Sequence, residues 1–522
     1  MNPQKKNTLL LDALSQTIVN PTASHRWHTL GERYGLDGDI EARKFVHETL
    51  LANVRKEGVE GLLLTTFMAA VTDDMTYTEE AAEIILKIRP FDPERLMAFA
   101  LYEWSRIIGK SANRTEFVTK LRQARAPEML QIVGSYVNAN APYLQPRPIN
   151  SIRKVALIVP YVGIAFQSVP TSMAFQQARL LIELGIEVHL FSAQELRIQQ
   201  MQHYLGDDAR VRVNEPDITV LQNIIPKGVA VTLCDERFSL MRRWHDIYEK
   251  VAEFDPDLVL FVGLNSPILT PLYASRPVLG LCVHSTSPMA PVDVWLTANK
   301  SLADRLSNDW GAAFPDAWGH YHPYRINLNP LQAPISRAQL NLKPQDLVMV
   351  SVGARLESEI QTEWATEIIG ILKTYPTAVL LLVGGTGTLP PALSNAPAAQ
   401  IRLLSQHDDV RSVFKICDVY VNPLRIGGGF SVAEAMAEGL PTLALNGSDG
   451  GNKLGDHASE TLAEYFDKLR SLIIDRQLRQ KIGASMRSLF SNTLDINRSG
   501  TSLMAACNLT RERYKLRTFT KD

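Results

Sequence analysis

The sequence predicts an α/β protein with two doubly wound parallel sheets, preceded by an all-helical domain. Three observations carry this prediction. Up to residue 138, apolar residues recur at three- and four-residue intervals, which is typical of amphipathic helices. From residue 154, short apolar runs alternate with helical segments, as expected for parallel strands buried on both faces. A second series of this kind begins at residue 347, and 522 residues are enough for about three domains.

The first domain is predicted to span residues 1–138. Within it, the run at 81–88 has helical spacing, and Asp92 followed by Pro93 has the pattern of an N-cap with proline at the first helical position. A polar stretch with three prolines follows, which favours an extended linker over 139–152.

The second domain is predicted over 153–330 and the third over 331–487, followed by a helical tail at 488–522. The expected strands of the second domain are 155–159, 187–191, 258–262 and 278–283, with a helix from Thr171 that Gly185 ends. The expected strands of the third domain are 347–352, 378–383, 419–421 and 442–445, with closing helices over 462–483. Two such Rossmann-like domains imply a cleft, with ligands at the carboxyl ends of the strands.

Composition describes a core-forming protein, with 45% hydrophobic and 21% charged residues and a net charge of -1. The lack of a basic excess argues against nucleic acid and anionic membranes as partners. No apolar run approaches the ~20 residues that span a bilayer, and the N-terminus does not read as a signal peptide. The four cysteines are far apart and predict buried thiols rather than zinc ligands. We therefore expect a cytoplasmic protein.

A glycine-rich turn at 427–429 is the most informative local feature. It follows the strand-like run 418–422 and opens a helix that stops at Gly439. Glycines there let the backbone approach a ligand, and the helix N-terminus favours an anion such as a diphosphate. Ser431 is the expected N-cap, and Glu434 lies about one turn inside the helix, within reach of sugar hydroxyls. Taken alone, the turn is equally compatible with an ordinary capped connection between strand and helix.

Four motifs in order resemble the donor-binding domain of GT-B glycosyltransferases, especially the large retaining group that uses nucleotide sugars. They are the turn after the first strand at 350–357, the second strand and its glycine turn at 381–387, the helix and strand at 410–423, and the nucleotide-sugar signature at 428–441. The preceding domain resembles the acceptor domain of that fold. The first domain is similar to the all-helical domain of some bacterial protein-glycosylating transferases.

The resemblance implies a hexosyltransferase-type enzyme with a donor site in the cleft. It places Glu434 on the ribose hydroxyls and Arg355 on the diphosphate, where a guanidinium offers a planar fork of donors. It also implies that His284 donates to the sugar, or acts as a base if the reaction inverts, although a structural histidine is equally compatible. The implied catalytic residues are His284 and Arg355, and the implied donor-binding residues are Gly163, Arg355, Gly428, Gly429, Phe430, Ser431 and Glu434.

Two positions depart from the family. Ile426 stands where an acidic residue usually faces the transferred sugar, and Ile360 stands where a lysine usually meets the diphosphate. Each charge-assisted contact is worth about 1.5–3 kcal/mol, so both losses together are large for a diphosphate site. Either Arg425 or Lys453 substitutes, or the chain is not an active transferase.

No metal and no cofactor is expected, since helix dipole and basic side chains suffice for the leaving diphosphate in this scheme. The Asp-x-Asp runs at 255–257 and 37–39 are expected to be caps or turns. His320 and His322 have a spacing that suits a metal, but a third ligand is missing from the pattern, and packing near the domain boundary is favoured.

The leading hypothesis is a glycosyltransferase that moves a sugar from a nucleotide-diphosphate sugar to a protein or glycan acceptor, with retention or inversion left open. The helical domain would present a large acceptor or an oligomerisation surface. The alternatives are an inactive binding or scaffold subunit of a glycosyltransferase complex, and a nucleotide-sugar epimerase on the same fold.

Overall fold

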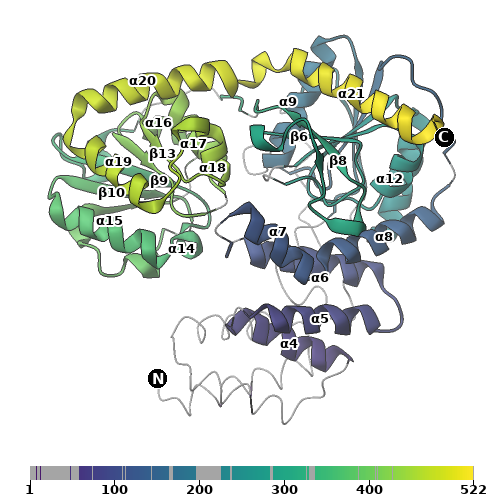
Figure 1. The fold of residues 1–522 in the computed structure, drawn as a ribbon, viewed down its shortest axis with the longest axis horizontal. Helices are drawn as coiled ribbons and strands as arrows, with labels where there is room; N and C mark the ends of the chain where they lie inside the picture. The colour runs from purple at the N-terminus through teal and green to yellow at the C-terminus, as the bar shows by residue number, and fades with distance from the viewer. Residues whose placement is uncertain are drawn as a thin grey trace.

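The structure is a computed structural model in which two α/β domains follow a set of helices (Figure 1). It describes Thr8, Asp12, Glu48 and residues 58–72, 74–108, 110–111, 113–142, 144–163, 169–195, 225–235, 238–282, 286–324, 326–328, 335–385, 387–405, 407, 409–425 and 427–520. The Asp-x-Asp run at 37–39 lies outside these residues.

Five described helices precede the first sheet: α4 (Gly58–Thr72), α5 (Met75–Lys87), α6 (Pro93–Ile108), α7 (Arg114–Gln123) and α8 (Ala126–Asn140). The predicted cap at the start of α6 is confirmed, because Asp92 Oδ1 accepts from the N–H of Glu94 at 3.0 Å. Asn113 caps α7 in the same way, through the N–H of Glu116. Below the two α/β domains in Figure 1, α6 and α7 lie closer to them than α4 and α5.

The first sheet has the order β3-β2-β1-β4-β5-β6-β8-β7, and all its pairings are parallel except β7 with β8. Its strands are β1 (Lys154–Ile158), β2 (Glu187–Ser192), β3 (Ala230–Leu233), β4 (Leu258–Val262), β5 (Val278–Leu281), β6 (Val294–Thr297), β7 (Leu306–Ser307) and β8 (Ala317–Tyr321). The helices of this domain are α9 (Val169–Glu183), α12 (Leu240–Phe254) and α13 (Leu269–Ser275).

The second sheet is parallel throughout, in the order β11-β10-β9-β12-β13. Its strands are β9 (Leu347–Val352), β10 (Ala378–Val383), β11 (Ile401–Leu404), β12 (Val419–Val421) and β13 (Thr442–Leu443). Its helices are α14 (Leu356–Glu359), α15 (Thr362–Thr374), α16 (Val410–Phe414), α17 (Gly429–Glu438), α18 (Asp449–Leu454), α19 (Leu462–Ile474) and α20 (Arg476–Thr493). Short 3-10 turns are Lys300–Leu302, Gly311–Ala313, Arg337–Leu340, Pro391–Leu393, Ala398–Gln400, Gly455–His457 and Ile496–Arg498.

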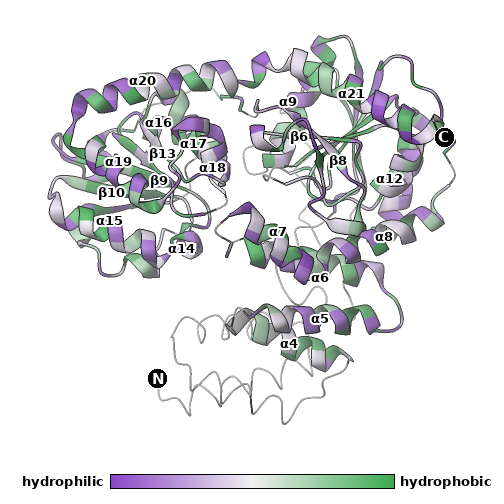
Figure 2. Cartoon of the chain, viewed as in Figure 1, coloured by the Kyte–Doolittle hydropathy of each residue, from purple (hydrophilic) through white to green (hydrophobic). Residues whose placement is uncertain are grey.

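Side chains of both sheets alternate between two apolar layers, as a doubly wound sheet requires. In β1, Val155 and Leu157 face one layer with α9, while Ala156 and Ile158 face another that α12, α13 and the N-terminal helices share. The second sheet is covered by α16, α17 and α20 on one face and by α15 and α19 on the other. Figure 2 shows hydrophobic residues along the strands and mixed faces on the surrounding helices. The predicted fold class is confirmed.

The last helix, α21 (Gly500–Phe519), returns from the second α/β domain to the first (Figure 1). Tyr514 donates to the carbonyl of Ser275 at 2.8 Å, and Arg517 Nε donates to the buried carboxylate of Asp293 at 2.5 Å. Apolar residues of α21 complete the core beside α9. The two α/β domains are therefore tied together both by the chain between β8 and β9 and by the crossing from α20 to α21. None of the described helices combines the length and apolarity that a membrane crossing requires.

Candidate functional site

The turn before α17 is built around a glycine that no other residue can replace without strain. Gly428 has φ +90, and a Cβ there would lie 2.4 Å from Asn422 Oδ1 and 2.6 Å from Arg425 Nη2. Both the left-handed backbone and the absence of space therefore require glycine. The turn carries the chain from the end of β12 into α17 at the carboxyl edge of the second sheet, the edge where ligands bind in such folds.

The first three residues of α17 are Gly429, Phe430 and Ser431, and the first hydrogen bond into the turn runs from the N–H of Val432 to the carbonyl of Gly428. The N–H groups before that bond have no partner inside the helix and carry the positive end of its dipole. The prediction that Ser431 is the N-cap is wrong. Gly428 holds that position, and the Ser431 hydroxyl instead contacts the Tyr420 hydroxyl at 2.8 Å.

Arg425 lies beneath this turn and is 5% exposed. Its guanidinium donates to Glu359 Oε2 at 2.8 Å, to Asn422 Oδ1 at 3.0 Å and to the carbonyl of Val352 at 2.7 Å. These contacts connect the loop before α17 to β9 and α14. Arg425 is therefore engaged inside the domain, and the structure does not place it where it could replace the missing lysine on a diphosphate.

Arg355 follows β9 and is 57% exposed. Its Nε and Nη2 atoms contact Glu359 Oε1 at 3.0 Å and 2.8 Å, respectively. A Cβ added at Gly427 would lie 4.0 Å from Arg355 Nη2, so this guanidinium stands beside the glycine turn. Ile360 follows Glu359 and is buried in the core shared with α15. This burial explains why position 360 does not carry the lysine expected from the resemblance.

Glu359 is almost completely buried between the two arginines. Burial raises the pKa of this carboxyl, but Arg425 and Arg355 more than offset that effect, so the pKa lies below its ordinary value. Glu359 is therefore a carboxylate at neutral pH. It is the site residue that the sequence prediction missed, and its four-residue separation from Arg355 was the signal that could have found it.

Glu434 lies on α17 with its side chain half-buried among charged neighbours. Its pKa is raised to about 7, mainly by burial; Arg411 opposes this rise, while Asp409 and Glu438 contribute to it. Arg411 itself is paired with Glu438, with its Nε 2.6 Å from Glu438 Oε1. The predicted position of Glu434, one turn into the helix whose start faces the ligand edge, is confirmed.

Of the other predicted site residues, the structure describes Gly163 and Lys453. Gly163 is buried after β1, and its N–H donates to Thr171 Oγ1 at 3.1 Å. His284 and Ile426 lie outside the described residues. Lys453 is buried on α18.

The two pairs weighed as metal ligands have structural partners. Asp255 contacts Arg276 Nη2 at 2.5 Å, and Asp257 accepts from the N–H groups of Arg153 and Lys154. His322 contacts Ser502 of α21 at 2.9 Å. Within the described residues, no three His, Cys, Asp or Glu side chains are grouped to hold a metal.

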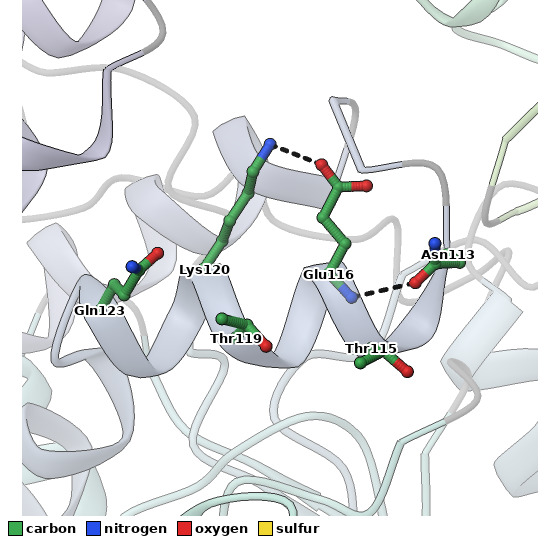
Figure 3. Close-up of a pocket in the computed structure, with 6 residues that line it drawn as sticks. All are labelled: Asn113, Thr115, Glu116, Thr119, Lys120 and Gln123. Carbon is green, nitrogen blue, oxygen red and sulfur yellow. Dashed lines mark hydrogen bonds and ion pairs between the residues drawn. The ribbon is translucent and has the colours of Figure 1, made fainter.

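A pocket of ≈ 610 Å³ lies along the polar face of α7 (Figure 3). Its described lining consists of uncharged polar side chains and one ion pair, Lys120 with Glu116 at 2.9 Å: Asn113, Thr115, Glu116, Thr119, Lys120 and Gln123. The opposite face of α7 is apolar and buried through Phe117, Val118 and Leu121. The pocket was not predicted, since amphipathic spacing alone does not distinguish a solvated helix face from a binding one.

Helix α7 connects both α/β domains. Arg114 pairs with Asp309, which also accepts from the N–H and the hydroxyl of Ser287 at 3.0 Å and 3.1 Å. Ser287 belongs to the loop after β5. At the start of α7, Asn113 Cβ lies 4.0 Å from the position of a Cβ added at Gly447, in the second domain.

Gly447 lies between β13 and α18, and the first residue of α18 packs against the start of α17. Two residues further on, Asp449 stands 3.1 Å from the position of a Cβ at Gly429. The pocket on α7 and the N-terminus of α17 are therefore linked through one short segment, 447–449.

Comparisons with known proteins agree with this arrangement. Residues 346–473 match the family described as Glycosyl transferases group 1, so the second α/β domain is a domain of that kind. Across 99% of both chains, the structure is similar to an O-GlcNAc transferase mutant from Thermobaculum terrenum, with a TM-score of 0.51 and 13% identity. That likeness shows the fold, two Rossmann-like domains in the GT-B arrangement with helices before them.

Two further solved structures have lower TM-scores. The N-terminal domain of trehalose-6-phosphate phosphatase from Candida albicans has a TM-score of 0.46 and 9% identity over 70% of this chain and all of its own. The glycosyltransferase SnogD from Streptomyces nogalater has a TM-score of 0.35 and 16% identity over 68% of this chain and all of its own. No curated protein matches the sequence.

Proposed function

We propose that this chain, which carries a glycosyl transferases group 1 domain, moves a sugar from a nucleotide-diphosphate sugar to an acceptor. The observation that carries the proposal is the N-terminus of α17, whose first N–H groups have no partner inside the helix and which a strict glycine turn presents at the carboxyl edge of the second sheet. An exposed arginine beside the turn and a carboxylate further along the helix match the two ends of a nucleoside diphosphate.

The proposed chemistry is substitution at the anomeric carbon, with the diphosphate as leaving group. The N–H groups of Gly429, Phe430 and Ser431 would stabilise the charge that develops on the diphosphate, because they are fixed before the reaction begins. Arg355 would add a mobile cation, and Glu434 would accept from the ribose hydroxyls. Metal-independent catalysis is part of the proposal.

His284 is proposed to contact the transferred sugar, as a hydrogen-bond donor in a retaining reaction or as the base in an inverting one. Support comes from the loop that follows β5, whose Ser287 is fixed by Asp309 and thereby by α7. The loop is thus connected to the helix that carries the pocket.

We infer that the acceptor occupies the pocket on α7. Its threonine hydroxyls and amide groups can exchange hydrogen bonds with either a peptide backbone or sugar hydroxyls. The segment 447–449 brings the pocket next to the start of α17, which is where an acceptor must meet the donor. A protein or a glycan acceptor is compatible with this lining.

The test is titration calorimetry with a panel of nucleoside diphosphates, followed by turnover with matching sugar donors. Replacing Glu434 with alanine removes a charge-assisted acceptor worth about 1.5–3 kcal/mol, so nucleotide affinity is expected to fall on the order of tenfold or more. Glu363→Ala, an exposed glutamate of α15, is the matched control and keeps wild-type affinity. Unchanged binding and turnover in Glu434→Ala would refute the site.

A second candidate is a donor-binding subunit that supports another transferase without catalysing transfer. It is favoured by one observation, the small number of basic side chains left for a diphosphate. Arg425 already donates to Glu359, Asn422 and the Val352 carbonyl. Ile360 is buried and uncharged. Nucleotide binding without turnover, for every donor and for both peptide and glycan acceptors, would favour this candidate.

A further inference from the structure

We propose that Glu359 is a positioning residue that holds Arg355 in the unliganded protein and releases it to the diphosphate when a donor binds. This inference rests on the proposed function, because it assigns a partner exchange to the same site. It adds Glu359, which neither the sequence resemblance nor the family match assigns.

The two arginines that Glu359 binds are held very differently. Arg425 is 5% exposed and has two further acceptors, Asn422 and the Val352 carbonyl. Arg355 is 57% exposed, and the contacts that fix its guanidinium within the described residues all go to Glu359 Oε1. When one arginine moves, it is therefore Arg355.

Arg355 lies close to the proposed diphosphate site. Its Nη2 atom is 4.0 Å from the place of a Cβ at Gly427, at the glycine turn that opens α17. The guanidinium has only to turn away from Glu359 to meet a diphosphate at the helix N-terminus. The Arg425 guanidinium is packed tightly against Gly353 and Gly428, because a Cβ added at either glycine would lie within 2.6 Å of it. Arg425 therefore has no room for the same movement.

The exchange is electrostatically balanced. The Glu359 carboxylate is buried, but the Arg355 guanidinium is 57% exposed, so water weakens their attraction, whereas a two-point guanidinium–phosphate contact at a helix N-terminus is among the stronger charged contacts. After Arg355 leaves, Glu359 keeps Arg425 at 2.8 Å, so no buried charge is left unpaired. Glu359 also lowers the net positive charge beside the turn, which weakens the attraction for any anion, the diphosphate included.

The test compares UDP, GDP, ADP and dTDP with their nucleosides, by titration calorimetry, on wild type, Glu359→Gln, Arg355→Ala and the double variant. Glutamine keeps an oxygen for Arg425 but loses the charge that holds Arg355. We expect Glu359→Gln to bind the preferred diphosphate several-fold more tightly, to leave nucleoside affinity unchanged, and to lose this gain in the Arg355→Ala background. Circular dichroism melts establish that each variant is folded.

A purely structural Glu359 predicts the opposite pattern. Folded Glu359→Gln that binds the diphosphate no more tightly than wild type would overturn the exchange and leave the proposed function standing. Should Glu359→Gln not fold, Glu359→Asp keeps the buried charge but withdraws it from both guanidiniums. Arg425 still has Asn422 and the Val352 carbonyl, whereas Arg355 loses the contacts that fix it, so the same expectations apply. Absence of diphosphate binding in wild type and every variant would overturn the proposed function and this inference together.

Discussion

At the scale of single residues, the raised pKa of Glu434 allows its proposed role as a ribose-binding carboxylate to be tested by changing the pH. Burial, helped by Asp409 and Glu438 and opposed by Arg411, raises its pKa to about 7. A carboxylate accepts from two hydroxyls, whereas the protonated acid has lost part of that capacity. Donor binding through Glu434 is therefore sensitive to pH close to neutrality.

We predict that affinity for the donor nucleotide rises between about pH 6 and about pH 8, with a midpoint near the pKa of Glu434. Glu434→Gln should flatten this dependence, and calorimetry at a series of pH values measures both. A dependence that persists unchanged in Glu434→Gln would assign the titration to another group.

Folding stability should respond in the opposite direction. The folded-state pKa of Glu434 lies above its ordinary value of 4.5, so the folded protein holds this proton more tightly than the unfolded chain. The contribution of Glu434 to the free energy of unfolding is complete below pH 4.5 and is lost as the pH rises through about 7.

Residue types in the signature were predictable, but their pairing was not. Sequence motifs indicated Glu434, Arg355 and the glycines, because the chemistry of a helix N-terminus follows from local pattern. The role of Glu359 depends on Arg425, 66 positions away in the chain, and local spacing says nothing about that contact. The same limit led to the wrong N-cap, since the helix begins two residues before Ser431.

At the scale of elements, the turn before α17 requires glycine at position 428. Two neighbouring glycine-to-alanine substitutions, at 428 and at 427, test this requirement. Gly428→Ala forces a left-handed φ on alanine and a clash with Asn422 and Arg425. We expect a cost on the order of 1–3 kcal/mol in stability and a loss of nucleotide affinity. Urea unfolding and calorimetry measure these.

Gly427→Ala is the matched control for Gly428→Ala. A Cβ at Gly427 has 4.0 Å to its nearest neighbour, Arg355 Nη2, so alanine is expected to be tolerated within about 0.5 kcal/mol. Equal damage from both substitutions would show that flexibility of the whole turn, rather than the conformation of Gly428, is what matters.

Strand prediction succeeded where burial on both faces produced a clear apolar run. Four predicted runs, 258–262, 347–352, 378–383 and 419–421, coincide with β4, β9, β10 and β12. Predictions missed β8, which contains Gly319 and His320, and β11, an edge strand with an arginine and an exposed leucine. Such strands are stabilised mainly by their neighbours in the sheet, so their sequences show little of the apolar pattern that predicts a strand.

At the scale of the whole molecule, α7 contacts the first α/β domain, and its N-cap residue, Asn113, stands beside Gly447 of the second. Arg122 donates to the carbonyl of Asp309 at 2.6 Å, and Arg114 pairs with the Asp309 carboxylate. Asp309 in turn fixes Ser287 after β5. The start of α7 and the loop after β5 are thus coupled through the carboxylate of Asp309.

We predict that Asp309→Ala lowers transfer to acceptor strongly while nucleotide affinity stays within about twofold of wild type, since the contacts of Asp309 with described residues go to α7 and to Ser287 rather than to α17. Asp316→Ala, an exposed aspartate in the same domain, is the control. Turnover assays and calorimetry on one preparation separate the two effects. Parallel loss of nucleotide binding and transfer would place Asp309 within the donor site itself.

The central claim is that the N-terminus of α17 holds the diphosphate of an activated sugar. The most direct measurement is a crystal structure of the protein with a bound nucleotide-diphosphate sugar. The account predicts phosphate oxygens on the N–H groups of Gly429, Phe430 and Ser431 and ribose hydroxyls on Glu434. A donor bound elsewhere, with those N–H groups covered by protein side chains, would contradict it.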